Sequence, residues 1–373
     1  MKFNVSATAL RERLQVLSKL LPSKPTTPIF DCFLFDLSGN ILKITVSDGD
    51  SVLISELEVN NEGADGRVAV VGKKLMEIVH AYGDQALSFD IDEKTLAITI
   101  KTESGHSSFV GQPASEYPEY SPLQEDVTTF SVPGKIMMDG IAQTAFAAAN
   151  DELRPIMGSV YFDMLPEGLT LVATDSHKLS RYKIPSIQSS EHRGFAFPLK
   201  PVMIAKSLFA AADDVMEIGF DSKYITCKTS LYLLKCRQVE GKYPPYEKVI
   251  PALPLPVSVV VDRKSLIAAL RRVMVCTDQA SSLIKMSISN GQLVIFGQDI
   301  NFSVQGEEHL PCQYEGESME IGFKAATFDN ILNALDSDEV VMNLTDKQRP
   351  GIFVPATPSE GSDVLMLLMP MML

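Results

Sequence analysis

The chain has 373 residues, of which 45% are hydrophobic, and a formal net charge of −14. This length is a soft prior for two or three domains, and an acidic chain is not expected to bind DNA over its whole surface. No run of 18 apolar residues occurs and no apolar stretch opens the chain, so neither a transmembrane helix nor a signal peptide is expected.

One pattern recurs six times along the chain. An apolar residue closes a short alternating run, which predicts a strand, and another apolar residue five positions later opens a run with helical spacing. The strand ends are Val5, Val70, Val132, Phe197, Val261 and Phe323, and the helix positions are Leu10, Leu75, Met137, Val202, Leu266 and Phe328. Successive strand ends lie 65, 62, 65, 64 and 62 residues apart. Such a period indicates a repeat architecture.

Further strand-like runs follow each helix. Turn residues at 38–40, 166–168 and 290–291 separate two apolar runs in the odd copies, which is typical of hairpins. Each unit is therefore predicted as strand, helix and three strands. Because odd and even copies resemble their own class more than each other, we predict an α+β fold of three two-part domains. The predicted domains are 1–125, 126–253 and 254–373, with linkers around 116–127 and 249–257.

The basic residues concentrate in the predicted helices. The windows 7–20, 72–83, 134–150, 199–212, 263–275 and 324–335 hold 13 Lys and Arg against 4 Asp and Glu. The helices therefore carry +9 and the rest of the chain −23. If the helices share one surface, that surface could admit a polyanion while the acidic exterior repels it. The alternative is that these cations lie on ordinary exposed helix faces, and the third and sixth helices are neutral.

Motifs for catalysis and metal binding are weak. Asp175, Ser176 and His177 are adjacent, so their side chains diverge and do not readily form a catalytic relay. Residues 47–51 resemble the start of a calcium loop, but Asn60 stands where the bidentate glutamate belongs. The five cysteines form no CxxC pair, which indicates reduced thiols, and no nucleotide-binding or zinc-protease motif occurs. We expect no enzymatic activity, no metal and no cofactor.

Five segments resemble the bacterial DNA polymerase III beta subunits, the sliding clamps, and the resemblance covers the full length. They are MKFNVSATALRERL (1–14), ATDSHKLS (173–180), GKYPPYEKVIP (241–251), MEIGFKAATFDNILNAL (319–335) and LLMPMML (367–373). The resemblance implies a cytoplasmic, head-to-tail homodimeric ring, with helices lining a pore and antiparallel sheets outside. It also implies sequence-independent, topological binding of double-stranded DNA, and partners that include the polymerase III catalytic subunit, a clamp loader complex and other proteins with a clamp-binding motif, with no membrane.

The resemblance and the helix positions together suggest which cations face DNA. The family carries a basic residue in the loop after the first helix, which Lys24 matches. The other candidates rest mainly on their position in the helices. The full set of candidate DNA-binding residues is Lys24, Lys73, Lys74, Lys200, Lys206, Arg271 and Arg272. Their contacts would be to phosphates and blind to sequence.

The resemblance further implies a pocket for short partner peptides between the second and third domains. The matching residues are Met157, Thr174, His177, Lys178, Leu179, Pro244, Lys248, Val249, Leu367, Leu368, Met369, Pro370 and Met371. The family often has glycine at Ser176, arginine at Lys178 and Lys248, and a basic residue at Met372. The residues alone favour a last core strand for the terminal apolar segment and a turn position for His177, and the resemblance reverses this interpretation of the segment.

The implied subunit interface joins the first domain of one chain to the third domain of another. Its candidate residues are Phe109 on one side, with Met274 and Val275 on the other. An alternative function is a repeat-built scaffold that binds proteins without encircling DNA. An open solenoid would need atypical capping repeats, whereas the first and last units here follow the template, which favours closure.

Overall fold

The computed structural model describes residues 1–123, 126–151, 153–209 and 214–373. Within these residues the predicted unit of strand, helix and three strands occurs six times, which confirms the prediction. The twelve apolar residues that define the repeat, from Val5 to Phe328, are all buried. The chain divides into two compact units, Met1–Met138 with Lys200–Gln238, and Asp139–Leu199 with Val239–Leu373.

Unit 1 contains the first domain and, from the middle domain, residues 126–138 and 200–238. Its helices are α1 (Ala7–Leu17), α2 (Gly72–Ala81) and α4 (Leu199–Ala205), with short 3₁₀ helices η1 (Pro28–Asp31) and η2 (Ala114–Glu116), and the boundary between the units falls within α3 (Gly134–Thr144). Its strands are β1 (Lys2–Ser6), β2 (Cys32–Ser38), β3 (Ile41–Ser47), β4 (Ser51–Glu58), β5 (Asn60–Asn61), β6 (Gly66–Val71), β7 (Ala86–Asp92), β8 (Ala97–Lys101), β9 (His106–Val110), β10 (Thr128–Pro133), β15 (Val215–Phe220), β16 (Tyr224–Lys228) and β17 (Tyr232–Arg237).

Unit 2 contains residues 139–199 and 239–253 of the middle domain and the whole third domain. Its helices are α5 (Arg263–Met274) and α6 (Ala325–Ala334), with η3 (Ala145–Ala147), η4 (Pro155–Gly158) and η5 (Tyr246–Val249). Its strands are β11 (Ser159–Leu165), β12 (Gly168–Thr174), β13 (Lys178–Ile184), β14 (Arg193–Pro198), β18 (Val257–Asp262), β19 (Leu283–Ser289), β20 (Gln292–Asp299), β21 (Val304–Pro311), β22 (Met319–Lys324), β23 (Glu339–Leu344), β24 (Gly351–Pro355) and β25 (Asp363–Leu368).

Strand pairing crosses from one predicted domain to the next inside each unit. The eight-stranded sheet of unit 1 has the order β10-β15-β16-β17-β4-β3-β2-β6, and that of unit 2 has β14-β11-β12-β13-β25-β24-β23-β18. The junctions are antiparallel, with Leu234 opposite Leu53 and Leu179 opposite Leu367. The smaller sheets are β5-β1-β7-β8-β9 and β21-β20-β19-β22. Backbone hydrogen bonds therefore connect strands across the boundaries between the predicted domains 1–125, 126–253 and 254–373.

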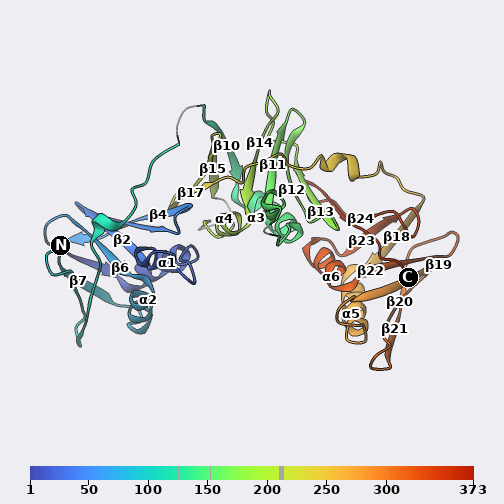
Figure 1. The fold of residues 1–373 in the computed structure, drawn as a ribbon, viewed down its shortest axis with the longest axis horizontal. Coiled ribbons are helices and arrows are strands. Elements are labelled where there is room, and N and C mark those ends of the chain that lie inside the picture. The colour runs from blue at the N-terminus through green and yellow to red at the C-terminus, as the bar shows by residue number, and fades with distance from the viewer. Residues whose placement is uncertain (124–125, 152, 210–213) are drawn as a thin grey trace. The chain divides into compact units, whose positions relative to one another are not determined.

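The helices form where the sequence supplies a cap and one apolar face. The Ser6 hydroxyl accepts from the backbone N–H of Ala9, and the Asp262 carboxylate accepts from Ser265 at 2.7 Å, so both α1 and α5 begin at a side-chain cap. Figure 1 shows the helices packed in pairs, α1 with α2 and α5 with α6.

Aromatic clusters fill the space between helices and sheets. In unit 1 the Phe3 and Phe89 rings stack with centroids 4.9 Å apart. In unit 2 the Phe162 and Phe195 rings stack at 4.8 Å, and Phe328 lies 5.1 Å from Phe353. Each of these side chains is fully buried, so the cores are held mainly by apolar burial.

Candidate functional site

The loop between β12 and β13 in unit 2 folds into a tight turn. The Thr174 hydroxyl donates to the carbonyl of Lys178 at 2.7 Å and accepts from the N–H of Ser176 at 3.2 Å. The Asp175 carboxylate accepts from the N–H groups of His177 and Lys178 at 2.9 and 2.8 Å. Ser176 has φ of 80°, in the left-handed region. These side-chain contacts fix the turn, together with the backbone hydrogen bond from the N–H of Asp175 to the carbonyl of Lys178 at 3.3 Å.

An ion pair neutralises the charge inside this turn. The Lys178 ammonium contacts the Asp175 carboxylate, and both side chains are largely shielded, at 13% and 23% exposed. Partial burial disfavours the charged carboxylate, but hydrogen bonds from the side chain and backbone of Lys178 and from His177 outweigh it. The pKa of Asp175 therefore lies below its ordinary value. Lys178 brings a donor to the site without adding net charge.

The segment between the second and third domains lies against the same turn. The Tyr246 hydroxyl donates to Asp163 Oδ2 at 2.7 Å, and burial together with this bond raises the pKa of Tyr246. The Tyr243 hydroxyl donates to the carbonyl of Val172 at 3.4 Å, and its ring stacks on Tyr161 with centroids 4.7 Å apart. The segment is therefore anchored by two buried tyrosines, which hold the residues between and after them in place.

The end of β25 and the tail after it complete the site. Leu367 pairs with Leu179 across the junction of β25 and β13. The N–H of Met369 then donates to the carbonyl of His177 at 2.8 Å, so the tail stays beside the turn. Three segments far apart in sequence thus meet at one place.

Between them lies a cavity of about 330 Å³. It is lined by Met157, Thr174, Ser176, Lys178, Leu179, Pro244, Pro245, Tyr246, Lys248, Val249, Leu367 and Met369. Val249 is 56% exposed and Met369 is 38% exposed, so apolar side chains reach its mouth. An apolar hollow with a few polar groups at its rim suits the capture of apolar anchors from an extended peptide.

The structure brings together most of the residues predicted for a peptide pocket. Met157, Thr174, Lys178, Leu179, Pro244, Lys248, Val249, Leu367 and Met369 line the cavity, whereas His177, Leu368, Pro370 and Met371 do not. His177 points into solvent and contributes its backbone carbonyl. Leu368 is buried but follows Leu367 in a strand, so its side chain faces the other side of the sheet. Met371 bridges to Gly322 instead.

Four residues near the cavity were missed by sequence reasoning. Ser176, Pro245 and Tyr246 line it, and Arg154 donates to the Ser176 hydroxyl at 3.0 Å while pairing with Asp151 at 2.9 Å. Pro245 and Tyr246 lie within the quoted segment GKYPPYEKVIP, which was the available signal. No local pattern in the sequence marks Arg154. It places a guanidinium at the rim.

The candidate DNA-binding residues of unit 1 are all on its surface or partly so. Lys24 and Lys73 are exposed, and Lys206 is partly exposed. Lys74 pairs with Glu77 at 3.2 Å. Lys200 pairs with Asp48 at 2.9 Å and donates to the carbonyl of Leu20. The Lys74–Glu77 pair is exposed on both sides, so it is weak and screened by salt, and the Lys74 ammonium can exchange its carboxylate for a phosphate. Asp48 is only 17% exposed, so Lys200 is held more firmly.

The candidate DNA-binding arginines of unit 2 also have carboxylate partners. Arg271 on α5 pairs with Asp329 on α6 at 2.9 Å, and Arg272 pairs with Glu308 on β21 at 2.6 Å. The hydrogen bonds to these carboxylates raise the pKa of each arginine. Both guanidinium groups are more than half exposed, at 57% and 58%. Local neutralisation leaves only a modest positive bias on these helices.

The candidate interface residues lie at the open edges of the smaller sheets. Phe109, partly exposed, is on β9, the edge strand of the five-stranded sheet. Met274 ends α5, which packs on β21, the edge strand of the four-stranded sheet. Val275 follows and is 83% exposed. Each edge therefore combines unpaired backbone groups with an apolar side chain.

Neither a metal site nor a membrane span emerges from the described part of the chain. There, no three His, Cys, Asp or Glu side chains gather in a way that could hold a metal ion. The helices found there also lack the length and the apolar character needed to cross a membrane.

Comparison with known families matches nearly the whole chain. Residues 1–121 match the N-terminal domain of the DNA polymerase III beta subunit, residues 131–245 its central domain, and residues 247–372 its C-terminal domain. The order of the three matches along the chain is the order of the domains in that family.

Individual relatives agree over similar lengths. The beta sliding clamp of Haemophilus influenzae is 26% identical, covering 93% of each chain. That of Synechococcus elongatus is 26% identical over 100% of both chains. Among solved structures, a sliding clamp of Pseudomonas aeruginosa bound to griselimycin superposes with a TM-score of 0.93, at 23% identity and 100% coverage of both chains. The last comparison shows a shared fold.

Proposed function

Since the chain belongs to the DNA polymerase III beta subunit family, the beta sliding clamps, we propose that it is a DNA sliding clamp for polymerase processivity. In this role it encircles duplex DNA and holds the replicative polymerase to its template. The observation that carries the proposal is the family match over three consecutive domains, on a fold built from six copies of one unit.

A pairing rule that the chain already uses twice supports ring closure. In each repeat, the third strand is counted after the helix. At each junction between domains, the third strand of an odd repeat pairs antiparallel with the third strand of an even repeat: β4 with β17, and β13 with β25. Of the six third strands, β9 and β21 remain at sheet edges. Pairing β21 of one copy with β9 of a second copy continues the rule, and two such contacts close a dimer. Phe109, Met274 and Val275 then belong to that interface.

The cations on and beside the helices suit a ring that slides. Lys24, Lys73 and Lys206 supply positive charge, while Lys74, Lys200, Arg271 and Arg272 are each shared with a carboxylate. Phosphate contacts made by such groups are weak and independent of base sequence. The closed ring then retains the protein on DNA, and the weak phosphate contacts allow it to slide.

The cavity beside β25 serves as the docking site for client proteins in this proposal. Its apolar lining takes the hydrophobic anchors of an extended segment, and Met157 and Met369 let it adapt to different clients. The clients are the polymerase III catalytic subunit, the clamp loader and other proteins that carry a clamp-binding motif. A tether of this kind requires no catalysis and no cofactor, and it operates in the cytoplasm, where the chromosome lies.

Retention on circular DNA tests the proposal. The protein is loaded onto nicked circular duplex with a clamp loader and separated from free protein by gel filtration, before and after the circle is cut once. We expect the protein to elute with circles and to be lost from linear DNA. A protein scaffold that never encircles DNA would be absent from both fractions, and an ordinary DNA-binding protein would stay with both.

A further inference from the structure

The chain leaves each of its three domains along the same path. After the last strand of each domain, the chain makes a backbone contact with the first strand of that domain's even repeat. The contacted residue is at an equivalent position each time. The crossing contacts are Gln112 with Ala69, Val239 with Ala196 and Met371 with Gly322. The crossed residues are also equivalent in register, because they lie opposite Leu34, Tyr161 and Lys285 respectively.

In the first two domains the departing segment covers the sheet with a tyrosine. Tyr117 is 4% exposed, and its hydroxyl lies between two acceptors, the carbonyl of Cys32 at 3.3 Å and that of Thr45 at 3.4 Å. Tyr243 is 7% exposed, and its hydroxyl donates to the carbonyl of Val172 at 3.4 Å. Thr45 and Val172 are equivalent, because Thr45 lies opposite Leu34 and Val172 lies opposite Tyr161. One aromatic contact is therefore made twice, at one position of the repeat.

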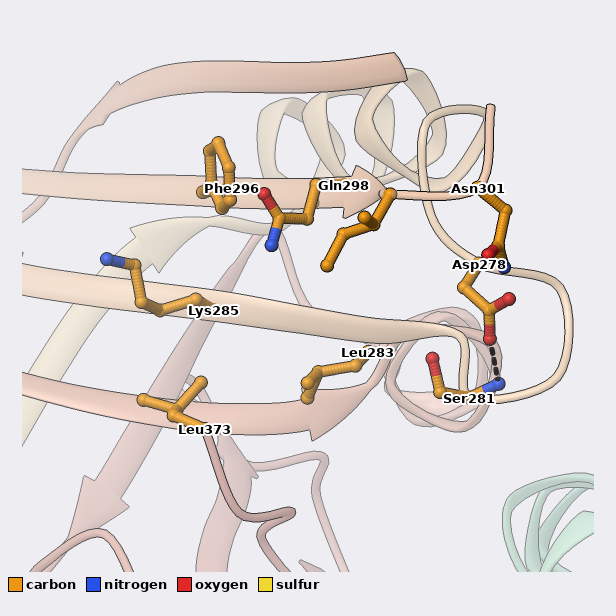
Figure 2. Close-up of a pocket in the computed structure, with 10 residues that line it drawn as sticks. Asp278, Ser281, Leu283, Lys285, Phe296, Gln298, Asn301 and Leu373 are labelled. Atoms are coloured by element: carbon orange, nitrogen blue, oxygen red, sulfur yellow. Dashed lines mark hydrogen bonds between the residues drawn. The ribbon is translucent and has the colours of Figure 1, made fainter. Parts of the chain in front are cut away.

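The third domain presents the same surface without a tyrosine. The equivalent carbonyl belongs to Phe296, which lies opposite Lys285. Among the described residues of the departing segment, Leu373 lines this surface, next to Leu283. A cavity of about 590 Å³ occupies the remaining space. Figure 2 shows Phe296 and Gln298 on one strand and Lys285 and Leu283 on the next, with Leu373 beyond them.

The cavity combines an apolar centre with groups of both charges. Phe296, Leu283 and Leu373 line it, together with Ile300, which is 78% exposed. The Lys285 ammonium lies 5.8 Å from the Phe296 ring centroid and pairs with Glu320 at 3.1 Å.

At the other end the Asp278 carboxylate accepts from the N–H of Ser281 at 2.8 Å, shown by the dashed line in Figure 2. Among the described residues no cation pairs with Asp278. A carboxylate without a cation at this end favours a ligand that carries a positive charge beside its apolar part.

We propose that this cavity is a second docking site, which binds an extended peptide segment of a partner protein through a tyrosine followed or preceded by a basic residue. The tyrosine packs on Phe296 as Tyr117 and Tyr243 pack on their own sheets, and the basic side chain faces Asp278. The site is distinct from the cavity beside β25, and the inference does not depend on encirclement of DNA.

The chain supplies its own probe for this site. The segment GKYPPYEKVI, residues 241–250, carries Lys242 beside Tyr243 and already occupies the equivalent surface of the second domain. A fluorescein-labelled peptide of this sequence is titrated with the full chain, and binding is followed by fluorescence anisotropy. The same peptide with both tyrosines replaced by alanine tests the aromatic contact.

Two substitutions at equally exposed positions give a matched comparison. Ile300 and Phe302 are both 78% exposed, but only Ile300 lines the cavity. We expect Ile300→Asp to weaken peptide binding by about tenfold or more, and Phe302→Asp to change it by less than about twofold.

Several results would overturn the proposal. They are equal binding by Ile300→Asp and the parent chain, equal binding of the alanine peptide, or no binding at about 1 mM protein. A change in the oligomeric mass of Ile300→Asp by light scattering would assign the cavity to contacts between copies of the chain, and the proposal would then also fail.

Discussion

Asp175 organises the turn that forms one wall of the peptide cavity. Its carboxylate accepts two backbone hydrogen bonds and pairs with Lys178, and the pKa of the group lies below its ordinary value. A carboxylate with a lowered folded pKa stabilises the fold above the ordinary Asp pKa of 3.8, and this contribution is lost as the pH falls through the folded pKa.

Replacing Asp175 by asparagine removes the charge and keeps an acceptor for the two N–H groups. We expect Asp175→Asn to lower the free energy of unfolding at pH 7 by about 1–2 kcal/mol. Below the folded pKa of Asp175, the difference between variant and parent should disappear. Urea unfolding at a series of pH values measures both effects. Glu360→Gln, in an exposed loop, is the control, and a difference that persists unchanged in acid would contradict the assignment.

The sequence predicts which segments form the pocket, but not which residues of each segment line it. The resemblance located the turn, the linker and the tail, so most lining residues follow from it. Which side chain of a segment faces the cavity depends on strand alternation and on tertiary contacts. Leu367 and Leu368 are adjacent and both buried, yet only Leu367 lines the cavity, while His177 serves through its backbone. Arg154 lies outside the segments that carry the resemblance, and only the tertiary fold brings it to the rim.

At the scale of elements, the tail after β25 links two cavities. Met369 lines the peptide pocket, Met371 bridges to Gly322, and Leu373 lines the cavity on the outer face of the third domain. β25 itself ends at Leu368 and is an inner strand of its sheet, so its pairing with β13 and β24 does not involve the five residues that follow.

Two truncations separate the roles of this tail. We expect removal of residues 369–373 to weaken binding of an extended client peptide with apolar anchors, such as QLSLF, by about tenfold or more, because the pocket loses the Met369 wall. Removal of residues 372–373 alone should leave that affinity within about twofold, since neither residue lines the pocket. Isothermal titration calorimetry measures the affinities, and circular dichroism checks the fold. Unchanged affinity of the longer truncation would exclude Met369 from the site.

The strands and helices were easier to predict than the pairing between the strands. Alternation and helical spacing are local, so six strand–helix units could be recognised from the sequence. The pairing of β4 with β17 and of β13 with β25 is not local, because no periodicity specifies which edge meets which. The division into two compact units, each taking half of the middle domain, follows from those pairings and was not foreseen.

At the scale of the whole molecule, the assembly rests on two open edges. β9 and β21 are the third strands that the described chain leaves unpaired on one side, and Val275 exposes an apolar side chain beside β21. Such edges invite pairing with another chain, and a specific partner protects them from unspecific aggregation.

Charged residues at the end of α5 should prevent that pairing. We expect the double variant Met274→Asp, Val275→Asp to be monomeric by light scattering and to be lost from nicked circular DNA. Ile41→Asp is the control, because Ile41 is an exposed apolar residue on β3, which is paired on both sides. A double variant that keeps the mass of a dimer would place the interface elsewhere.

The position of β25 has a consequence for synthesis on the ribosome. β13 lies between β12 and β25, so one edge of β13 stays open until the chain has been extended from Lys178 to Leu368. At 5–20 residues per second this interval lasts roughly 10–40 s. During that time a nascent chain carries an apolar strand edge, and neighbouring nascent chains of the same polysome carry the identical edge. Production of this protein should therefore depend on nascent-chain chaperones more than its finished stability would suggest.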